Sequence, residues 1–533
     1  MQQTTTAGFR ASLVAPAMLA AFFLLAGLAV PSVASAKPSV GEFEWFKCNK
    51  QTPSLRCGVI VLPRDYSKPN GKKVALVAAK APATGKRKGT IFYNPGGPGS
   101  SGVQQVLGGV ASILPASIRR RFDFVSWDPR GVGQSRPSIE GCKAIGGLPI
   151  GVLPETGIPT RSQWLSFLSQ YRGQQRQLGL RCLPRNLGIA RHMGTNDVVR
   201  DLNMMRKAVG DRKLTYWGAS YGTRIGYVYA LRYPQRLRAI LLDGSVDPRR
   251  GWREFARVRP QATDRALEVM ARPRVRPAFA EDILATRDDL RVNGPITVEA
   301  GRFDQWTFQA FVGQNLFAQF QWTNIQELID AINQVRGTSR SVKRAKGVIQ
   351  EAYEDVRDRP LYPWIVNPRA GNPTANALLT NRIINRLDYS NGNIPSDVAD
   401  EMLLNNVENH PFNAMVTASL VTNSAGIGSL KPDPVPLTST PRFARIAREV
   451  ENVLISGSTG DGATPAPWTA QMAASFPRAA VIRFNGWQHV NWMAIQSACV
   501  NDPITRFILT TRRPDPKRPS VCPFAPPAPP LAP

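Results

Sequence analysis

Apolar and polar positions alternate along this chain in patterns typical of strands that are linked by helices. Two β-rich runs, at 57–66 and 72–81, are separated by a turn-forming stretch at 67–71, which predicts an opening pair of strands. Shorter apolar runs follow, and each leads into a loop, as buried parallel strands do. These shorter runs lie at 90–93, 122–127, 214–217 and 237–242.

Helical patterns lie between these apolar runs. Residues 197–209 place Val198, Leu202 and Met205 at helical spacing, and Gly210 ends the pattern. A small-residue helical run begins near Thr223, directly after the run at 214–217. The alternation predicts an α/β fold with a mostly parallel, doubly wound sheet.

The alternation disappears between about 248 and 448, where helical, aromatic and charged segments such as 306–335 take over. We interpret this block as a large helical cap inserted into the sheet domain. Its aromatic residues are expected to form the core of the cap rather than a cofactor site, although some could line a substrate channel. They are Phe308, Phe311, Phe317, Phe320 and Trp322. Strand patterns return at 453–455 and 480–484.

The length of the chain favours two or three domains, or one domain with a large insertion, and the patterns divide it into five predicted parts. Residues 1–36 form a leader, 37–247 the first part of the sheet domain, and 248–448 the cap. Residues 449–512 complete the sheet domain, and 513–533 form a proline-rich tail.

The amino-terminal leader has the pattern of a cleavable export signal. Arg10 precedes an apolar stretch at 13–30, and the small residues at 34–36 form a cleavage pattern, so the mature chain is expected to begin near Lys37. An uncleaved membrane anchor is the alternative, because the apolar stretch approaches spanning length. The prediction is a protein that is secreted or held in the cell envelope or periplasm.

Six cysteines in an exported chain favour disulfides over metal sites. Their positions suggest three local pairs, Cys48 with Cys57, Cys142 with Cys182, and Cys499 with Cys522. No Cys-x-x-Cys motif occurs, and the chain has three histidines, so neither a metal nor another cofactor is predicted.

The chain is strongly basic, with 67 Lys and Arg against 38 Asp and Glu and a formal net charge of +29. Such an excess could attract an anionic envelope polymer, a nucleic acid or a membrane surface, or it could be a solvated, arginine-rich surface. We favour the solvated surface, because the basic residues are scattered and no nucleic-acid-binding module is visible. No specific nucleic-acid partner is predicted, and an electrostatic association with an anionic envelope stays open, as does the oligomeric state.

A Gly-x-Ser-x-Gly motif centred on Ser220 lies between the strand at 214–217 and the following helix. A serine at the apex of such a turn is held in strained backbone geometry and exposed, and the flanking Gly218 and Gly222 let strand and helix approach closely. Ser220 is therefore the predicted nucleophile.

A serine nucleophile needs a histidine base and a carboxylate that holds the histidine in the correct tautomer. In α/β-hydrolases the chain order is serine, acid, histidine, and Ser220, Asp461 and His489 occur in that order. Asp461 and His489 each follow one of the last two predicted strands. The long gap before Asp461 fits an inserted cap.

Other residues compete for these roles. Asp243 ends the strand at 237–242, a position that some α/β-hydrolases use for the acid, but Asp461 is preferred because its glycine-containing loop is free to face His489. His192 and His410 are interpreted as surface or cap residues, because neither follows one of the last strands of the sheet.

The tetrahedral intermediate of such a reaction requires backbone N–H donors that are already in place. The glycine-rich stretch 94–99 follows the strand at 90–93, so the N–H groups of Gly97 and Tyr221 are predicted to form an oxyanion hole. A purely structural Gly-Pro loop is the alternative.

Several of these motifs together resemble the tripeptidyl aminopeptidase and proline iminopeptidase group of serine peptidases. The resemblance rests on residues 94–102, 127–135 and 218–223, and its carboxyl-terminal part on Asp461 with the pattern around Ser497 to Cys499 and Cys522. It implies an α/β-hydrolase fold and an exported enzyme that removes short peptides from free N-termini, with catalysis by Ser220, Asp461 and His489. The resemblance fades across the cap.

The leading hypothesis is thus a serine exopeptidase that acts on peptides. An esterase, lactonase or amidase with the same triad is the main alternative, because the cap chooses the substrate. A non-catalytic envelope-binding protein is a third. A free amine would need carboxylates in the pocket, and the cap offers Glu254, Asp264, Glu268, Glu281, Asp282 and Asp304.

Overall fold

The computed structural model describes residues 40–143, 149–249, 251–270, 277–316, 321–337, 342–358, 373–389, 394–409 and 413–525. The predicted leader at 1–36 lies outside these ranges, as do Phe317, Phe320 and His410. Within these ranges, no helix is both long and apolar enough to cross a membrane.

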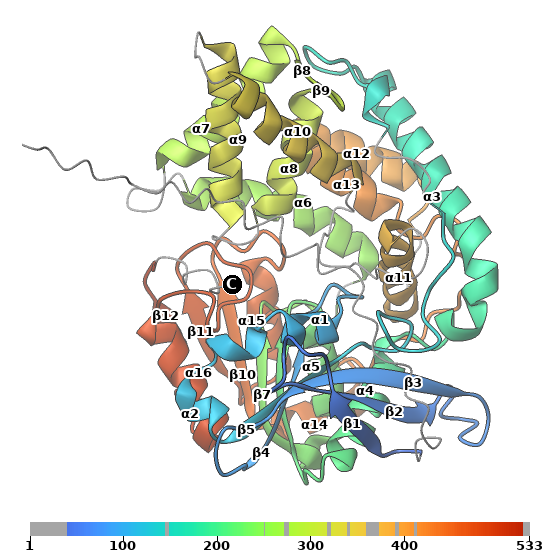
Figure 1. Cartoon of the computed structure of the whole chain (residues 1–533), viewed down its shortest axis with the longest axis vertical. Helices are drawn as coiled ribbons and strands as arrows, with labels where there is room; N and C mark the ends of the chain where they lie inside the picture. The colour runs from blue at the N-terminus through green and yellow to red at the C-terminus, as the bar shows by residue number, and fades with distance from the viewer. Residues whose placement is uncertain are drawn as a thin grey trace, which may run out of the picture.

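A ten-stranded sheet forms the base of the molecule (Figure 1). Its strand order is β1-β2-β3-β5-β4-β6-β7-β10-β11-β12. The strands β1 to β3 and β5 pair antiparallel, and from β5 onward the neighbours are parallel. The strands are β1 Phe43–Lys47, β2 Arg56–Pro63, β3 Lys73–Ala81, β4 Gly89–Asn94, β5 Phe122–Trp127, β6 Leu214–Ala219, β7 Leu237–Asp243, β10 Val453–Ser458, β11 Ala480–Phe484 and β12 Ser520–Cys522.

Helices cover both faces of this sheet, which confirms the doubly wound α/β prediction. Tyr216 and Trp217 are neighbours on β6, yet they belong to two different buried apolar clusters, because successive strand residues point to opposite faces. One cluster includes side chains of α4 and α5, and the other includes side chains of α1 and α16. The helices of the sheet domain are α1 Gly102–Leu107, α2 Ala116–Arg119, α4 Thr195–Ala208, α5 Gly222–Arg232, α14 Pro441–Glu449, α15 Ala466–Ser475 and α16 Ala498–Thr510.

A helical layer follows β7 in the chain and lies above the sheet in Figure 1. Phe308, Phe311 and Trp322 are buried in its core, as expected for core aromatics. The elements of this layer are α6 Trp252–Met270, α7 Pro277–Asn293, β8 Ile296–Val298, β9 Gly301–Phe303, α8 Gln305–Asn315, α9 Trp322–Arg336, α10 Val342–Asp358, α11 Pro373–Asp388, α12 Ser396–Asn409 and α13 Ala414–Val421.

The 30-residue helix α3, Arg161–Ala190, joins the cap from an earlier part of the chain. Its Trp164 and Phe167 share a buried cluster with Trp252 of α6 and Trp306 of α8. Figure 1 shows α3 running along one side of the molecule, beside both the cap and the sheet domain. The wall of the cap is thus built from two separate stretches of sequence.

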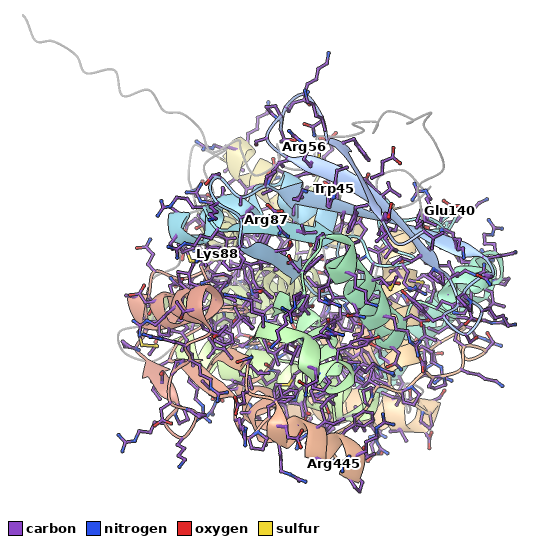
Figure 2. The ribbon with its side chains drawn as sticks, turned by 90° about the horizontal axis from the view of Figure 1, so that it is seen from below. Trp45, Arg56, Arg87, Lys88, Glu140 and Arg445 are labelled. Carbon is purple, nitrogen blue, oxygen red and sulfur yellow. A yellow bond between two sulfur atoms is a disulfide. The ribbon has the colours of Figure 1, made fainter. Side chains whose placement is uncertain are left out.

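The three predicted disulfides are all present: Cys48 with Cys57, Cys142 with Cys182, and Cys499 with Cys522. Basic side chains lie on separate parts of the molecule. In Figure 2 Arg56 of β2 and the exposed Arg445 of α14 lie at opposite edges of the view. Some of this charge is paired, since Arg87 contacts both Asp123 and Asp211.

Candidate active site

Ser220 sits on a sharp turn between β6 and α5, with a positive φ of 55°. A non-glycine residue adopts this conformation only when its surroundings hold it there. Two hydrogen bonds hold it there: the Ser220 N–H donates to the carbonyl of Asp243 at 2.9 Å, and the Thr223 side-chain hydroxyl donates to the Ser220 carbonyl at 2.6 Å.

The glycines of the motif are required by close approach. A Cβ on Gly218 would lie 2.3 Å from the carbonyl oxygen of Gly222, and a Cβ on Gly222 would lie 2.5 Å from the carbonyl oxygen of Asn94. Both distances are shorter than van der Waals contact. The turn, the start of α5 and the end of β4 therefore pack together only with glycine at these positions.

The structure brings His489 and Asp461 together. The His489 Nδ1 lies 2.9 Å from Asp461 Oδ2 and 3.1 Å from Oδ1. The Asp461 side chain is fully buried, whereas His489 retains 14% of its side-chain exposure. A carboxylate on Nδ1 fixes the imidazole tautomer and leaves Nε2 to take up a proton.

Asp461 is itself oriented by the loop that follows β10. Its Oδ1 accepts from the N–H groups of Ala463 and Thr464 at 2.8 Å, and its Oδ2 accepts from the Thr464 hydroxyl at 2.7 Å. The carboxylate is therefore held on the side of His489. The glycine-containing loop predicted from the sequence does point its acid at the histidine.

Asp243, the competing acid, occupies a different place. Its carboxylate accepts from the backbone N–H groups of Asn491 and Trp492 at 3.0 and 2.9 Å, just beyond His489. Burial raises the pKa of Asp243 above its usual range, and the two N–H bonds partly offset this shift. Asp243 thus holds the loop of the candidate base, and Asp461 contacts the base directly.

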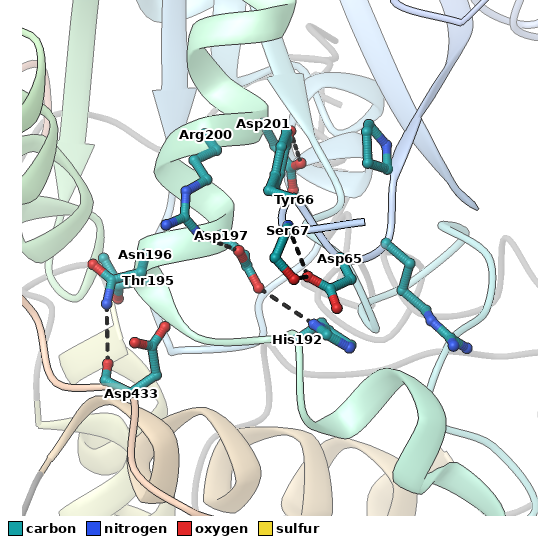
Figure 3. Close-up of polar contacts among 12 residues, drawn as sticks. Asp65, Tyr66, Ser67, His192, Thr195, Asn196, Asp197, Arg200, Asp201 and Asp433 are labelled. Carbon is teal, nitrogen blue, oxygen red and sulfur yellow. Dashed lines mark hydrogen bonds and ion pairs between the residues drawn. The ribbon is translucent and has the colours of Figure 1, made fainter. Parts of the chain in front are cut away.

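His192 lies in a separate polar cluster at the start of α4 (Figure 3). Its Nδ1 is 3.6 Å from Asp197, and Arg200 contacts the same carboxylate at 2.6 Å. Among the residues that the structure describes, His192 is not part of the cavity that contains Ser220.

The predicted oxyanion loop lies against the turn of Ser220. A Cβ on Gly96 would lie 2.8 Å from the Ser220 Cβ and 3.0 Å from the Tyr221 nitrogen, so this loop touches the turn directly. Gly97 and Tyr221 both line the same cavity as Ser220. Asn94 accepts from the Gly96 N–H, and Asn381 of α11 donates to the Pro98 carbonyl at 3.0 Å, which fixes the loop from both sides.

A cavity of about 350 Å³ contains Ser220 and His489. The sheet domain contributes Gly97, Tyr221 and Thr464 to its wall. The cap covers it with side chains from α3, α6, α11 and the segment that follows α13; they are Tyr171, Gln175, Trp252, Phe255, Arg259, Leu378, Asn381, Arg382, Asn385 and Asn423. Substrate chemistry at Ser220 would therefore take place beneath the cap.

Comparison with known proteins decides the family. The family model described as the alpha/beta hydrolase fold matches residues 89–493, which is most of the chain. The chain belongs to the α/β-hydrolase family. This confirms the fold predicted from the sequence.

Curated relatives of this hydrolase match it over a shorter stretch. It is 39% identical over 221 residues to serine protease Hip1 of Mycobacterium tuberculosis, covering 40% of this chain and 41% of that protein. It is 33% identical over 229 residues to tripeptidyl aminopeptidase of Streptomyces coelicolor, covering 41% of each chain. It is 33% identical over 257 residues to carboxylesterase B of Mycobacterium tuberculosis, covering 44% of this chain and 48% of that protein. The match thus spans less than half the length of each of these relatives.

The motif at 127–135 supports the hydrolase core rather than the cavity. Buried Asp128 accepts from the Ser101 hydroxyl and from the N–H of Gln134 at 2.6 and 2.7 Å. Buried Arg130 pairs with Asp201 at 2.6 Å. These contacts fix the loops behind the oxyanion segment.

Sequence reasoning missed how the hydrolase core meets its cap. Buried Asp388, at the end of α11, accepts from the Tyr221 hydroxyl at 2.9 Å and from the Thr195 hydroxyl at 2.6 Å. Trp487, two residues before His489, donates to the Leu316 carbonyl and packs in the core of the cap. No local motif marks these positions, and the only signal would have been the buried polar and aromatic residues themselves.

The six carboxylates suggested for amine binding are not among the cavity-lining residues that the structure describes. Glu254 and Glu268 pair with arginines of their own helix, and Asp304 caps α8 through the N–H of Thr307. Asp264 accepts from Asn413. Glu281 and Asp282 are exposed on α7.

Proposed function

We propose that this chain is an exported serine hydrolase that cleaves peptides through an acyl-enzyme on Ser220. The observation that carries the proposal is the 2.9 Å contact between His489 and buried Asp461, in a cavity that also contains Ser220 on a strained turn. This combination supplies a nucleophile, a base and an orienting carboxylate.

The reaction would follow from this geometry in two halves. The Ser220 Oγ attacks the substrate carbonyl carbon as its proton passes to His489 Nε2, and the resulting oxyanion is stabilised by the N–H groups of Gly97 and Tyr221. His489 then protonates the leaving amine, and the C–N bond breaks to leave an ester on Ser220. Water, deprotonated by His489, hydrolyses that ester and returns the proton to Ser220.

Export is supported by the three disulfides, because disulfides persist in oxidising compartments outside the cytosol. The leader pattern at 1–36, with a mature start near Lys37, supports the same proposal. We place the enzyme in the secreted or cell-envelope fraction.

Peptides are the favoured substrate class because relatives of this chain include a serine protease and a tripeptidyl aminopeptidase. An aminopeptidase that acts on free N-termini is the finer form of this proposal. An esterase or amidase with the same triad is the second candidate, favoured by the similarity to carboxylesterase B. The cap residues decide between them.

The test is labelling of the purified protein with a fluorophosphonate probe, followed by mass spectrometry of the labelled peptide. We expect one label, on Ser220, and its loss in Ser220→Ala and His489→Ala without a change in melting temperature. His192→Ala is the matched control and should label normally. A label on another serine, or full labelling of His489→Ala, would contradict the proposed roles.

A further inference from the structure

The described wall of the cavity carries basic side chains and no carboxylate. The described lining residues include three basic side chains, Arg259, Arg382 and His489, and no Asp or Glu. Two carboxylates that contact lining residues, Asp461 and Asp388, are already occupied by His489 and by Tyr221 and Thr195. A third buried carboxylate, Asp247, follows the lining residue Val246 and pairs with Arg249 at 3.4 Å.

Arg382 gives the cap side of this wall a buried positive charge. Its guanidinium donates to the carbonyl oxygens of Gln175, Asn423 and Ala425, which are neutral acceptors. No carboxylate among the described residues forms an ion pair with it. Burial lowers the pKa of Arg382 to about 10, which still leaves it charged at neutral pH.

Two buried donors on the same wall have no acceptor among the described residues. They are the Asn423 side-chain nitrogen and the Ser100 hydroxyl, and the two residues are 6% and 2% exposed. A Cβ on Gly97 would lie 2.9 Å from the Ser100 hydroxyl, so this donor is adjacent to the oxyanion loop. A buried donor without an acceptor is costly and indicates a place for one.

These groups lie along one continuous surface. Asn381 contacts the Pro98 carbonyl of the oxyanion loop, its neighbour Arg382 contacts Asn423, and both residues of α11 line the cavity. The wall therefore combines the buried charge of Arg382 with two donors that lack an acceptor among the described residues, on Asn423 of the cap and on Ser100 beside the oxyanion loop. Such a surface complements carbonyl and carboxylate oxygens and repels an ammonium group.

We propose that the cap selects substrates whose acyl part is N-blocked or carries a carboxylate, and that it discriminates against a free N-terminal amine. This inference rests on the proposed function, since it concerns the substrate of the Ser220 site. It distinguishes a peptidase that acts on N-blocked peptides from an aminopeptidase that requires a free N-terminus.

The test uses three tripeptidyl arylamides that share one sequence and differ at the N-terminus, which is free, acetylated or succinylated. At about pH 6.5 the free amine is charged, because α-amino groups have a pKa of about 7.7–8.0. We expect kcat/KM to be at least about tenfold higher for the acetyl and succinyl substrates than for the free amine, the succinyl substrate being the best. The ratio of kcat/KM for the acetylated substrate to that for the free amine should decrease at about pH 9, where the amine is neutral.

A variant gives an independent check. Asn423→Asp places a carboxylate on the wall and should reduce the preference for the acetylated substrate by about tenfold or more. Asn409→Asp, at an exposed end of α12, is the matched control and should leave the ratio unchanged. If no arylamide is cleaved, protection of Ser220 from the fluorophosphonate probe by the corresponding tripeptide amides provides the same ranking.

A free-amine substrate that is cleaved or bound as well as its acetylated twin would overturn this inference and support the aminopeptidase. Loss of all labelling at Ser220 would instead overturn the proposed function, and this inference with it.

Discussion

Asp243 ties the candidate nucleophile to the loop of the candidate base. Its backbone carbonyl accepts from Ser220, and its carboxylate accepts from Asn491 and Trp492. The loop contains two further non-glycine residues with positive φ, Val490 at 68° and Met493 at 62°. Such backbone conformations cost energy, so the buried carboxylate stabilises a loop that would otherwise relax.

Replacing the two acids by asparagine separates their roles. Asp461→Asn should lower kcat/KM by about 10⁴, because an amide no longer enforces the correct tautomer of His489. Asp243→Asn should lower activity less, but it should destabilise the fold by about 1–3 kcal/mol, because one of the two backbone N–H groups loses its acceptor. Kinetics and chemical denaturation of both variants check this expectation, and the reverse ranking of activity would give the acid role to Asp243.

Asp128 should make stability depend on pH. Burial raises its pKa to about 6, although its hydrogen bonds from Ser101, Gln134 and Val103 oppose the shift. The folded state therefore favours the protonated form of Asp128. The contribution of this group to the unfolding free energy is fully present below about pH 4 and is lost as the pH rises to about 6. A shift of this size corresponds to roughly 3 kcal/mol.

Asp128→Asn removes this ionisation. Relative to the unchanged protein, the variant should gain up to about 3 kcal/mol in unfolding free energy between pH 4 and pH 7. Denaturant titrations at both pH values measure the difference. Parallel pH profiles for the two proteins would show that Asp128 does not titrate in this range.

At the scale of elements, the site depends on how closely α5 approaches β4 and β6. Gly222→Ala would place a methyl group 2.5 Å from the backbone carbonyl of Asn94, which cannot move without shifting the oxyanion loop. We expect a loss of about 1–3 kcal/mol in unfolding free energy, together with reduced activity.

Gly173→Ala is the matched control for this change. Gly173 lies within α3, and an added Cβ there meets no atom within 4 Å. This variant should be more stable by about 0.5–1 kcal/mol, because glycine weakens the middle of a helix. Thermal unfolding and probe labelling of both variants provide the measurement, and equal stability would argue against the close approach.

At the scale of the whole molecule, the disulfide between Cys499 and Cys522 joins the last helix to the last strand of the sheet. It spans 23 residues and holds β12 against β11, where Phe484 pairs with Cys522. A loop of this length stabilises a fold by about 3 kcal/mol.

Replacing both cysteines by alanine should therefore lower the unfolding free energy by about 3 kcal/mol. Val521→Ala, at an exposed position of β12, should change stability by less than about 0.5 kcal/mol. Denaturation of both variants measures this contribution. An unchanged stability of the double variant would mean that β12 is held by its strand pairing alone.

Several parts of the structure could be predicted because they depend on neighbours in the sequence. Buried parallel strands such as β4, β6 and β7 require continuous apolar runs, and the sharp turn at Ser220 requires glycine at 218 and 222. The positions of the six cysteines suggested three local pairs, and the structure contains these three disulfides, with sequence separations of 9, 40 and 23 residues. The chain order of serine, acid and histidine placed Asp461 and His489 in loops at the same edge of the sheet.

Other elements carry no comparable local signal. The helix α3 contains Gly173, Gly179 and Pro184, which are typical of helix ends, yet it continues for 30 residues because the cap and sheet domain pack along it. The strands β1 and β12 are short and lie at the edges of the sheet, where apolar patterning is weak.

The sequence by itself determined the α/β-hydrolase core and the residues of the candidate triad, because both depend on short patterns with a direct physical cause. Only the tertiary structure decided that Asp461 contacts His489 while Asp243 holds the loop beyond it. It also decided the charge of the cavity, where Arg382, Gln175 and Asn423 meet from three distant segments. The composition of this surface depends on packing between segments that are far apart in the sequence, so no local sequence pattern predicts it.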